Sequence, residues 1–215
     1  MKILAVDTAL GACSVALIED DRVLAHRHVA MERGHAEALA PMVEEAMRDA
    51  ASFDSLDRLA VTTGPGTFTG QRVGLAFMRG LRIALNRPLV GVTTLAAMAA
   101  QAKSETGAPR AIALHDARRD DVYLEIENVL PPAVMPFADM IARLRALSGD
   151  ETIALAGTAA PRACEALANG FFLSAIRQPD ALWVALLAAK AEASDMAPSP
   201  LYLRAPDAKL PAERR

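Results

Sequence analysis

The sequence predicts an α/β protein made of two similar subdomains, the second shorter than the first. Short apolar runs alternate with stretches of helical periodicity, which is typical of α/β folds. Apolar residues occupy 53% of the 215 positions, enough for a sizeable core. A polar, breaker-rich segment at 102–109 divides the chain. We therefore expect subdomains at 1–103 and 104–215, with the last helix and the tail as candidates to return to the first.

Three strands joined by short turns are expected at the start of the chain. The apolar run from Ile3 to Val6 ends at Asp7, which predicts a buried central strand with a carboxylate at its carboxyl end. Segments 13–18 and 23–29 follow, and the second alternates in polarity as a half-buried strand does. Together they predict an antiparallel meander.

Helices and two further strands complete the first subdomain. Apolar residues recur at helical spacing within 35–50, where Pro41 implies either a kink or the first turn of a new helix. The next elements are a strand, a glycine-rich loop, a helix, a strand and a helix, at 59–62, 64–70, 70–85, 89–92 and 95–102. This β-β-β-α-β-α-β-α order matches the ribonuclease H-like unit that actins and sugar kinases use twice. We therefore expect an actin-like ATPase (ASKHA) fold.

The second subdomain repeats these kinds of element in a shorter span, too short to close a full nucleotide cleft. Pro131, Pro132 and Pro136 predict a loop, and four prolines between 198 and 211 predict an extended tail. The expected strands are 111–114, 122–126 and 153–156, and the expected helices are 138–147, 160–168 and 181–193.

The loop at 64–70 (GPGTFTG) lies between an expected strand and an expected helix. Glycine permits positive φ and close backbone approach, and Thr67 or Thr69 can cap the helix. A helix amino terminus with free N–H groups is a natural anion site. Two interpretations stay open: a phosphate or nucleotide contact through Gly64, Gly66 and Thr67, or a tight strand-to-helix turn.

The helix after this loop has two distinct faces at about 100° per residue. Gly70 and Gly74 lie beside the apolar face, where missing side chains let another backbone come close. This pattern suits a helix–helix interface, and a solvated surface helix is the alternative. One face carries Arg72, Leu75, Arg79 and Arg82, and the apolar face carries Val73, Phe77, Leu81 and Ala84.

Asp7 and Thr8 follow the first strand, where actin-like folds place an acidic residue facing the metal–nucleotide cleft. The segment behind them keeps small residues and one glycine, Gly11, so the match to a phosphate-binding hairpin is partial. Asp7 and Thr8 are therefore candidate nucleotide contacts, with a turn-capping carboxylate as the alternative.

Charge and composition limit the chemistry. The chain has 23 basic and 26 acidic residues and 4% aromatics, which argues against a large phosphate-binding surface or base-stacking platforms. The four histidines form no HExxH or HxxxH pattern, and neither cysteine has a neighbouring histidine, so neither a metal nor a catalytic residue is predicted. Two separated cysteines and an amino terminus unlike a signal peptide predict a reduced, cytoplasmic protein without membrane association.

Six segments resemble the TsaB (YeaZ) family, in order along nearly the whole chain. The segment GPGTFTGQRVG is the most specific, and 128–178 carries little of the resemblance. Gln71 departs from the pattern, since an apolar residue is common there. The six segments are 3–8, 35–41, 64–74, 91–95, 116–123 and 200–204.

The resemblance implies a non-catalytic scaffold for making threonylcarbamoyladenosine beside the tRNA anticodon. The implied partners are the transferase paralogue TsaD and the ATPase TsaE, with a homodimer through the same surface when TsaD is absent, and with tRNA only through the complex. No cofactor is implied except ATP or ADP at the partner interface. TsaD carries an HxxxH metal pair where this chain has Thr94 and Met98, which are unsuitable ligands for a hard metal.

The expected partner surface lies on the first subdomain. A metallopeptidase of the M22 type, disfavoured by the missing HxxxH, and a small actin-like ATPase are the alternative functions. The residues expected at the surface are His35, Glu37, Leu39, Val43, Thr69, Gly70, Arg72, Val73, Gly74, Leu75 and Arg79.

Overall fold

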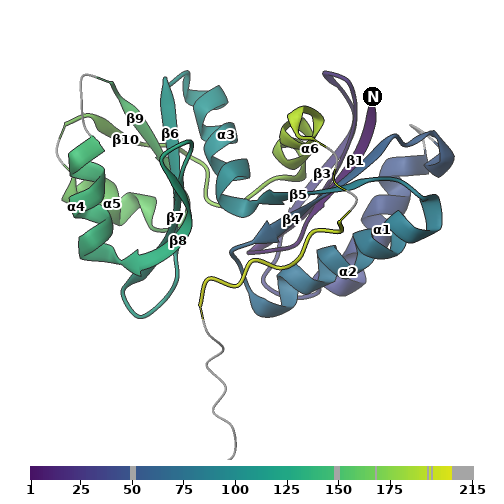
Figure 1. Cartoon of the computed structure of the whole chain (residues 1–215), viewed down its shortest axis with the longest axis horizontal. Helices are drawn as coiled ribbons and strands as arrows, with labels where there is room; N and C mark the ends of the chain where they lie inside the picture. The colour runs from purple at the N-terminus through teal and green to yellow at the C-terminus, as the bar shows by residue number, and fades with distance from the viewer. Residues whose placement is uncertain (49–51, 148–150, 168, 193, 195, 205–215) are drawn as a thin grey trace, which may run out of the picture.

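The computed structural model describes residues 1–48, 52–147, 151–167, 169–192, 194 and 196–204. It contains two five-stranded sheets (Figure 1). The first comprises β1 (Lys2–Asp7), β2 (Ala12–Glu19), β3 (Arg22–Ala30), β4 (Arg58–Gly64) and β5 (Leu89–Thr93). The second comprises β6 (Arg110–Asp116), β7 (Asp121–Ile126), β8 (Leu130–Pro136), β9 (Ile153–Ala156) and β10 (Phe171–Leu173).

The two sheets have the same topology. Their strand orders are β3-β2-β1-β4-β5 and β8-β7-β6-β9-β10. If the strands of each sheet are numbered one to five along the chain, both sheets have the order 3-2-1-4-5. In both sheets the first strand pairs antiparallel with the second and parallel with the fourth. The central β1 is fully buried from Ile3 to Asp7, as its apolar run predicts.

Each sheet has two helices of its own on one face. α1 (His35–Arg48) and α2 (Phe68–Leu85) cover the first sheet, where Leu4 and Val6 of β1 face Leu39, Val43 and Leu75. α4 (Phe137–Leu147) and α5 (Ala160–Ala166) cover the second sheet. We call the first sheet with α1 and α2 the first half, and the second sheet with α4 and α5 the second half.

The remaining two helices are exchanged between the halves. α3 (Thr94–Thr106) follows the first sheet but packs its Leu95 and Met98 on β6 and β9 of the second. α6 (Ala181–Lys190) follows the second sheet but packs its Val184 and Ala185 on Ile3 and neighbouring residues of the first. The two helices lie side by side in the middle of the molecule (Figure 1).

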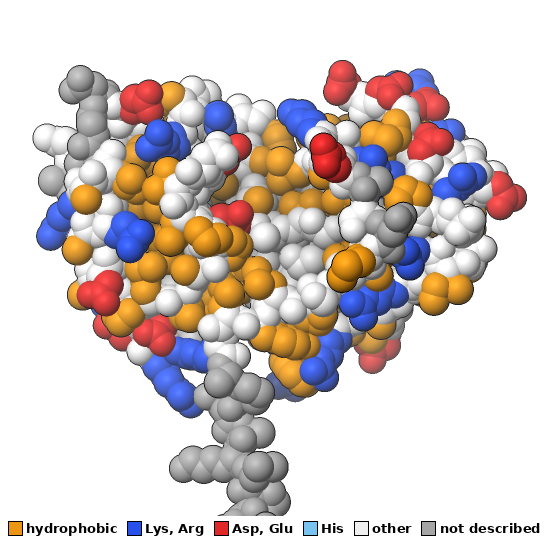
Figure 2. Space-filling view, in the orientation of Figure 1, with side chains coloured by type: hydrophobic (Ala, Val, Ile, Leu, Met, Phe, Trp, Pro, Cys, Tyr) orange, Lys and Arg blue, Asp and Glu red, His pale blue; other side chains and the backbone are white. Residues whose placement is uncertain are grey.

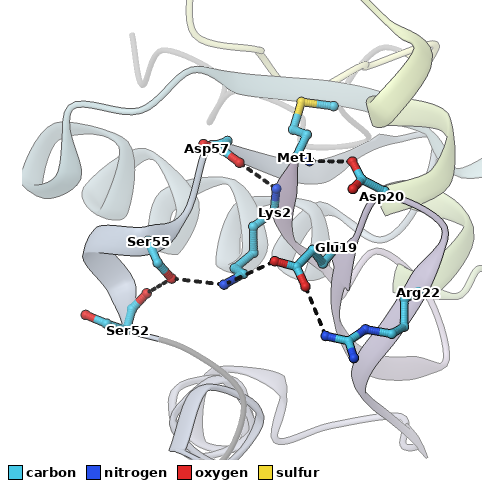
Figure 3. A network of polar contacts seen from close by, with 8 residues as sticks. All are labelled: Met1, Lys2, Glu19, Asp20, Arg22, Ser52, Ser55 and Asp57. Atoms are coloured by element: carbon cyan, nitrogen blue, oxygen red, sulfur yellow. Dashed lines mark hydrogen bonds and ion pairs between the residues drawn. The ribbon is translucent and has the colours of Figure 1, made fainter.

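Polar contacts fasten the amino end of β1 (Figure 3). The Lys2 N–H donates to the Asp57 carboxylate at 2.6 Å, the Lys2 ammonium lies 3.6 Å from Glu19, and the Met1 amine pairs with Asp20. Such exposed pairs contribute little individually. The amino end of β1 is therefore surrounded by charged side chains.

Four elements differ from the sequence predictions. The segment with Pro131, Pro132 and Pro136 is strand β8 and not a loop, because β8 lies at the sheet edge, where missing N–H donors are tolerated. α1 is one helix that contains Pro41, so no new helix begins there. α3 continues to Thr106 and ends where the Gly107 N–H bonds Lys103 O. Strand β10 was not predicted, because three residues carry little periodicity.

In the part of the chain that the structure describes, no helix is long and apolar enough to cross a membrane.

Candidate functional site

The glycine-rich loop packs directly on the carboxyl end of β1. The Thr67 N–H donates to Ala9 O at 2.8 Å. A Cβ at Gly66 would lie 2.4 Å from Ala9 O, and a Cβ at Gly70 would lie 2.2 Å from Thr8 O. Both distances are below real Cβ contacts, so glycine is required here by the chain's own backbone. The tight-turn interpretation accounts for these two glycines.

Thr8 is bonded to the first two turns of α2. Its hydroxyl donates to Gly70 O at 2.7 Å and accepts from the Gly74 N–H at 3.0 Å. A Cβ at Gly74 would lie 2.8 Å from Thr8 Oγ1. The close approach expected at Gly70 and Gly74 is thus made by Thr8 of the same chain, and it needs no helix from a partner.

Asp7 is enclosed by the fold. Its Oδ1 accepts from Thr62 Oγ1 at 2.6 Å and from the Ala9 N–H at 3.2 Å, while Oδ2 is buried without a hydrogen-bond partner among the described residues. Burial raises the pKa of this carboxyl to about 7, and the two hydrogen bonds oppose the rise. A carboxyl that is 0% exposed does not face a cleft.

The other candidate nucleotide contacts are also used internally. Gly64 is buried with φ at 108°, and the side chain of Gln71 fills the space beside it. Thr67 is the N-cap of α2, since its hydroxyl accepts from the Gly70 N–H at 3.0 Å. Gln71 itself is 3% exposed and its Oε1 has no hydrogen-bond partner among the described residues, which fits a position where an apolar residue is common.

The residues expected at the partner surface fall into two groups. Leu39, Val43 and Leu75 are buried in the core of the first half, so their side chains do not lie on its surface. His35 is also buried and donates from Nε2 to Leu10 O at 3.0 Å, which ties the start of α1 to the β1–β2 turn. Glu37, Thr69 and Arg72 are exposed, while Val73 and Arg79 are half-buried.

Small side chains line the exposed sides of α1 and α2. Ala36 and Ala40 are exposed on α1, and Ala76 and Gly80 are exposed on α2. A Cβ at Gly80 would meet nothing within 4 Å, and Ile83 beyond it is 79% exposed. These two neighbouring helices therefore form a partly apolar surface with few protruding side chains, to which a second protein can approach closely.

The tail crosses this half of the molecule and uses two of the arginines of α2. We call the tail residues 196–204 the strap; in Figure 1 it is the yellow segment that crosses β5 and β4. Arg79 donates two hydrogen bonds to Pro198 O, at 3.0 and 2.5 Å. Arg72 donates from Nε to the Tyr202 hydroxyl at 2.7 Å. Sequence periodicity placed both arginines on one helix face but gave no sign of these contacts.

The described residues hold no group of three or more His, Cys, Asp or Glu side chains that could bind a metal ion. Thr94 and Met98, at the positions that the resemblance aligns with the HxxxH pair of TsaD, are both fully buried. The Thr94 hydroxyl donates to Pro65 O at 2.6 Å, so it fixes the glycine-rich loop. His26 is bonded through Nε2 to Asp180 at 2.8 Å.

Comparison with known proteins agrees with this architecture. A family model described as TsaD, tRNA N6-adenosine threonylcarbamoyltransferase, matches residues 28–201. The Escherichia coli K12 tRNA threonylcarbamoyladenosine biosynthesis protein TsaB is 37% identical over 165 residues, which cover 70% of this chain and 69% of that protein. The solved structure of YeaZ from Pseudomonas aeruginosa is 33% identical with a TM-score of 0.81, covering 94% of this chain and 99% of that one.

A more distant likeness concerns the fold alone. An activator of 2-hydroxyisocaproyl-CoA dehydratase from Clostridium difficile, solved with bound ADPNP, is 9% identical with a TM-score of 0.50, over 88% of this chain and 95% of that one. The fold and these matches define an actin-like α/β protein related to the threonylcarbamoyltransferases. Within that class, the chain belongs to the TsaB (YeaZ) family. The predicted fold class and family are confirmed.

Proposed function

We propose that this chain is a non-catalytic subunit that assembles with a TsaD-type transferase and a TsaE-type ATPase to modify adenosine beside the tRNA anticodon. The relative from Escherichia coli is named for this biosynthesis, and the matching family model is that of the transferase. We place the work in the cytoplasm, with tRNA bound only by the assembled complex. Without the transferase, the same surface pairs two copies of the chain.

One observation carries the non-catalytic part of the proposal. At the carboxyl end of β1, Asp7 is fully buried and both hydrogen-bonding functions of the Thr8 hydroxyl are used by α2. Groups that would meet a metal–nucleotide in this fold are therefore committed to hydrogen bonds within the chain, Asp7 with Thr62 and Ala9 and Thr8 with α2. We propose that the chain carries no cofactor of its own, and that any ATP or ADP is bound where the partner meets it.

The second part rests on the exposed faces of α1 and α2. Small side chains there let another helix approach, and the 79% exposed Ile83 supplies apolar area. Burial of apolar area at the core of an interface favours association. We propose that the transferase docks on this pair of helices.

Reconstitution tests the function. Purified TsaD-type transferase, TsaE-type ATPase, threonylcarbamoyl-AMP synthase and tRNA are mixed with and without this chain, and modified adenosine is measured. We expect modification only when the chain is present, and no ATP hydrolysis or peptide cleavage by the chain alone. Full modification in its absence would reject the proposal.

A pair of matched variants tests the surface. Ile83→Glu should weaken transferase binding by about tenfold or more, because it places a charge in an apolar contact. Val129→Glu, at a 55% exposed position in the second half, is the control and should bind as the unchanged chain does. Equal binding by both variants would remove α2 from the interface.

A further inference from the structure

The strap is fastened at three points that span both halves. Pro198 is held by Arg79 and lies against β5, where a Cβ on Gly91 would be 2.6 Å from the proline ring. The Leu201 N–H donates to Thr63 O of β4 at 2.8 Å. Arg204 donates to Ala117 O at 2.7 Å in the second half. These contacts hold the strap in a defined position on both halves.

The last fastening holds an unusual turn. Arg118, Arg119 and Asp120 all have positive φ, at 64°, 54° and 64°, in the turn between β6 and β7. Three consecutive non-glycine residues in this region are costly and persist only when their surroundings fix them. Arg204 contributes to this by pairing with Asp121 and bonding the Ala117 carbonyl. The strap and the turn therefore stabilise each other.

Between these fastenings, an aromatic–arginine stack is exposed. The rings of Phe68 and Tyr202 stack with centroids 5.9 Å apart and planes at 26°, and the Arg72 guanidinium carbon lies 3.5 Å from the Phe68 centroid. Phe68 is 57% exposed and Tyr202 is 47% exposed. One ring comes from the amino terminus of α2 and the other from the strap, and the Arg72–Tyr202 hydrogen bond locks them together.

Composition and rigidity make this stack suited to protein recognition. Aromatic and arginine side chains are enriched among residues that dominate binding energy, and a group already held in place loses little entropy on binding. The stack is also continuous with the exposed side of α2, since Thr69 and Arg72 are both exposed.

Nucleic acid fits the stack less well. Figure 2 shows Lys and Arg side chains beside the point where the described tail ends. However, Arg204 is paired with Asp121 and Arg162 with Asp120, and the whole chain has a net charge of -3. The two rings already contact each other, so they leave no slot for a base between them.

We propose that the Phe68–Arg72–Tyr202 stack is a docking point for the TsaD-type transferase, so that the strap forms part of the partner-binding surface. This inference rests on the proposed function. Arg79 is then a positioning residue: it acts on the partner through Pro198 and does not itself touch it.

The test measures the affinity of the full-length chain for the purified transferase by titration calorimetry. Tyr202→Ala and Phe68→Ala should each raise Kd by about tenfold or more. Phe172→Ala, which removes a 36% exposed aromatic ring from β10 in the second half, is the matched control and should leave Kd unchanged. Circular dichroism and thermal melting of each variant establish that it is folded.

A double-mutant cycle tests the role of Arg79. Arg79→Ala should weaken binding and make the chain around Pro198 accessible to protease, and Arg79→Lys should restore part of both. Added to Tyr202→Ala, the Arg79→Ala change should lower the affinity for the transferase little further, because both changes act on the strap. Full additivity would show that Arg79 does not act through the strap.

The outcomes separate this inference from the function on which it rests. Binding by Tyr202→Ala and Phe68→Ala as tight as that of the unchanged chain would overturn the docking point and leave the function standing. Unchanged transferase affinity combined with weaker binding of an anticodon stem-loop RNA would reassign the stack to RNA and overturn the inference. No binding by the unchanged chain would overturn the proposed function itself.

Discussion

The two halves share one strand order but differ in the helices that they present. After its fourth strand, each half turns sharply at a glycine that presses on the end of the first strand. A Cβ at Gly66 would meet Ala9 O at 2.4 Å, and a Cβ at Gly157 would meet Leu114 O at 2.2 Å. The helices that follow differ: α2 has 18 residues and a threonine cap, whereas α5 has 7 residues and no side-chain cap. The glycine turn after the fourth strand is thus common to both halves, whereas a long helix after it occurs only in the first half, where α2 forms part of the proposed partner surface.

The carboxyl ends of the first strands also differ. Asp7 of β1 is fully buried, whereas Asp116 of β6 is exposed and accepts the Arg118 N–H at 2.7 Å in a local turn. The same place in the topology thus holds an enclosed carboxyl in one half and a solvated one in the other. Position in a fold therefore does not decide the pKa of a carboxyl; its burial does.

The largest expected effect is the pH dependence that Asp7 contributes to the first half. In the second half, burial lowers the pKa of His115 to about 4, which acts in the opposite direction between that value and about 6.5. The pKa of Asp7 is raised to about 7 in the folded chain, above the value of about 3.9 expected when unfolded. The unfolded state therefore loses this proton first, and the contribution of Asp7 to stability falls by about 3 kcal/mol as pH rises from 4 to 7. Asp7→Asn should remove most of that slope in urea unfolding measured across this range. Asp116→Asn is the comparison variant and should keep the Asp7 contribution, although it also removes a charge that raises the pKa of His115. An unchanged slope in Asp7→Asn would contradict the comparison.

A smaller effect is expected at the glycines that the halves share. Gly66→Ala and Gly157→Ala should each destabilise by about 2–3 kcal/mol, since the new methyl group meets a backbone oxygen that cannot move freely. Gly157 also has φ at 94°. Gly80→Ala in α2 meets nothing within 4 Å and should stabilise by about 0.5–1 kcal/mol. Urea unfolding measures all three. A neutral Gly157→Ala would show that only the first half depends on this turn.

The smallest effect concerns how the exchanged helices begin. Asp180 caps α6 and pairs with His26 of β3, and Thr93 caps α3 and donates to Glu125 of β7. Each exchanged helix thus starts at a carboxylate contact: the contact of α6 is with the first half, and that of α3 joins the two halves. The hydrogen bond to Asp180 raises the pKa of His26, so the pair stabilises fully below the unfolded value of about 6.5 and less as pH rises above it.

His26→Ala should therefore cost at most about 1 kcal/mol at pH 6, because the ring is partly exposed, and less at pH 8. Thermal melting at both pH values measures this difference. A larger cost at pH 8 than at pH 6 would contradict the assigned pairing.

Sequence patterns predicted the local elements better than the long-range contacts. Ile3 to Val6 and Asp7 were predicted correctly as a buried strand ending in a carboxylate, because periodicity and composition are local properties. The prolines of β8 were misread as a loop, since nothing local marks a sheet edge. Leu75 was grouped with the arginines of α2, although it is buried, because helical spacing gives a face but not what covers it.

The candidate site shows the same limit. Glycine-rich spacing indicated a close approach at Gly70 and Gly74 but could not say that Thr8 makes it. Arg79 and Pro198 are 119 positions apart, so their contact has no trace in any window of sequence. The partner surface and the nucleotide contacts stay predictions.

The exchange of α3 and α6 has a consequence for synthesis on the ribosome. One face of the first sheet, which includes Ile3, Ala5 and Ala16, is covered by α6, whose last residue is Lys190. That face stays without its helix until nearly the whole chain has been translated. The first sheet cannot complete its packing as an early, independent unit, although domains generally fold as they emerge. A nascent chain arrested before residue 181 should expose this apolar face of the first sheet to chaperones. The yield of folded protein would then depend on the late steps of translation.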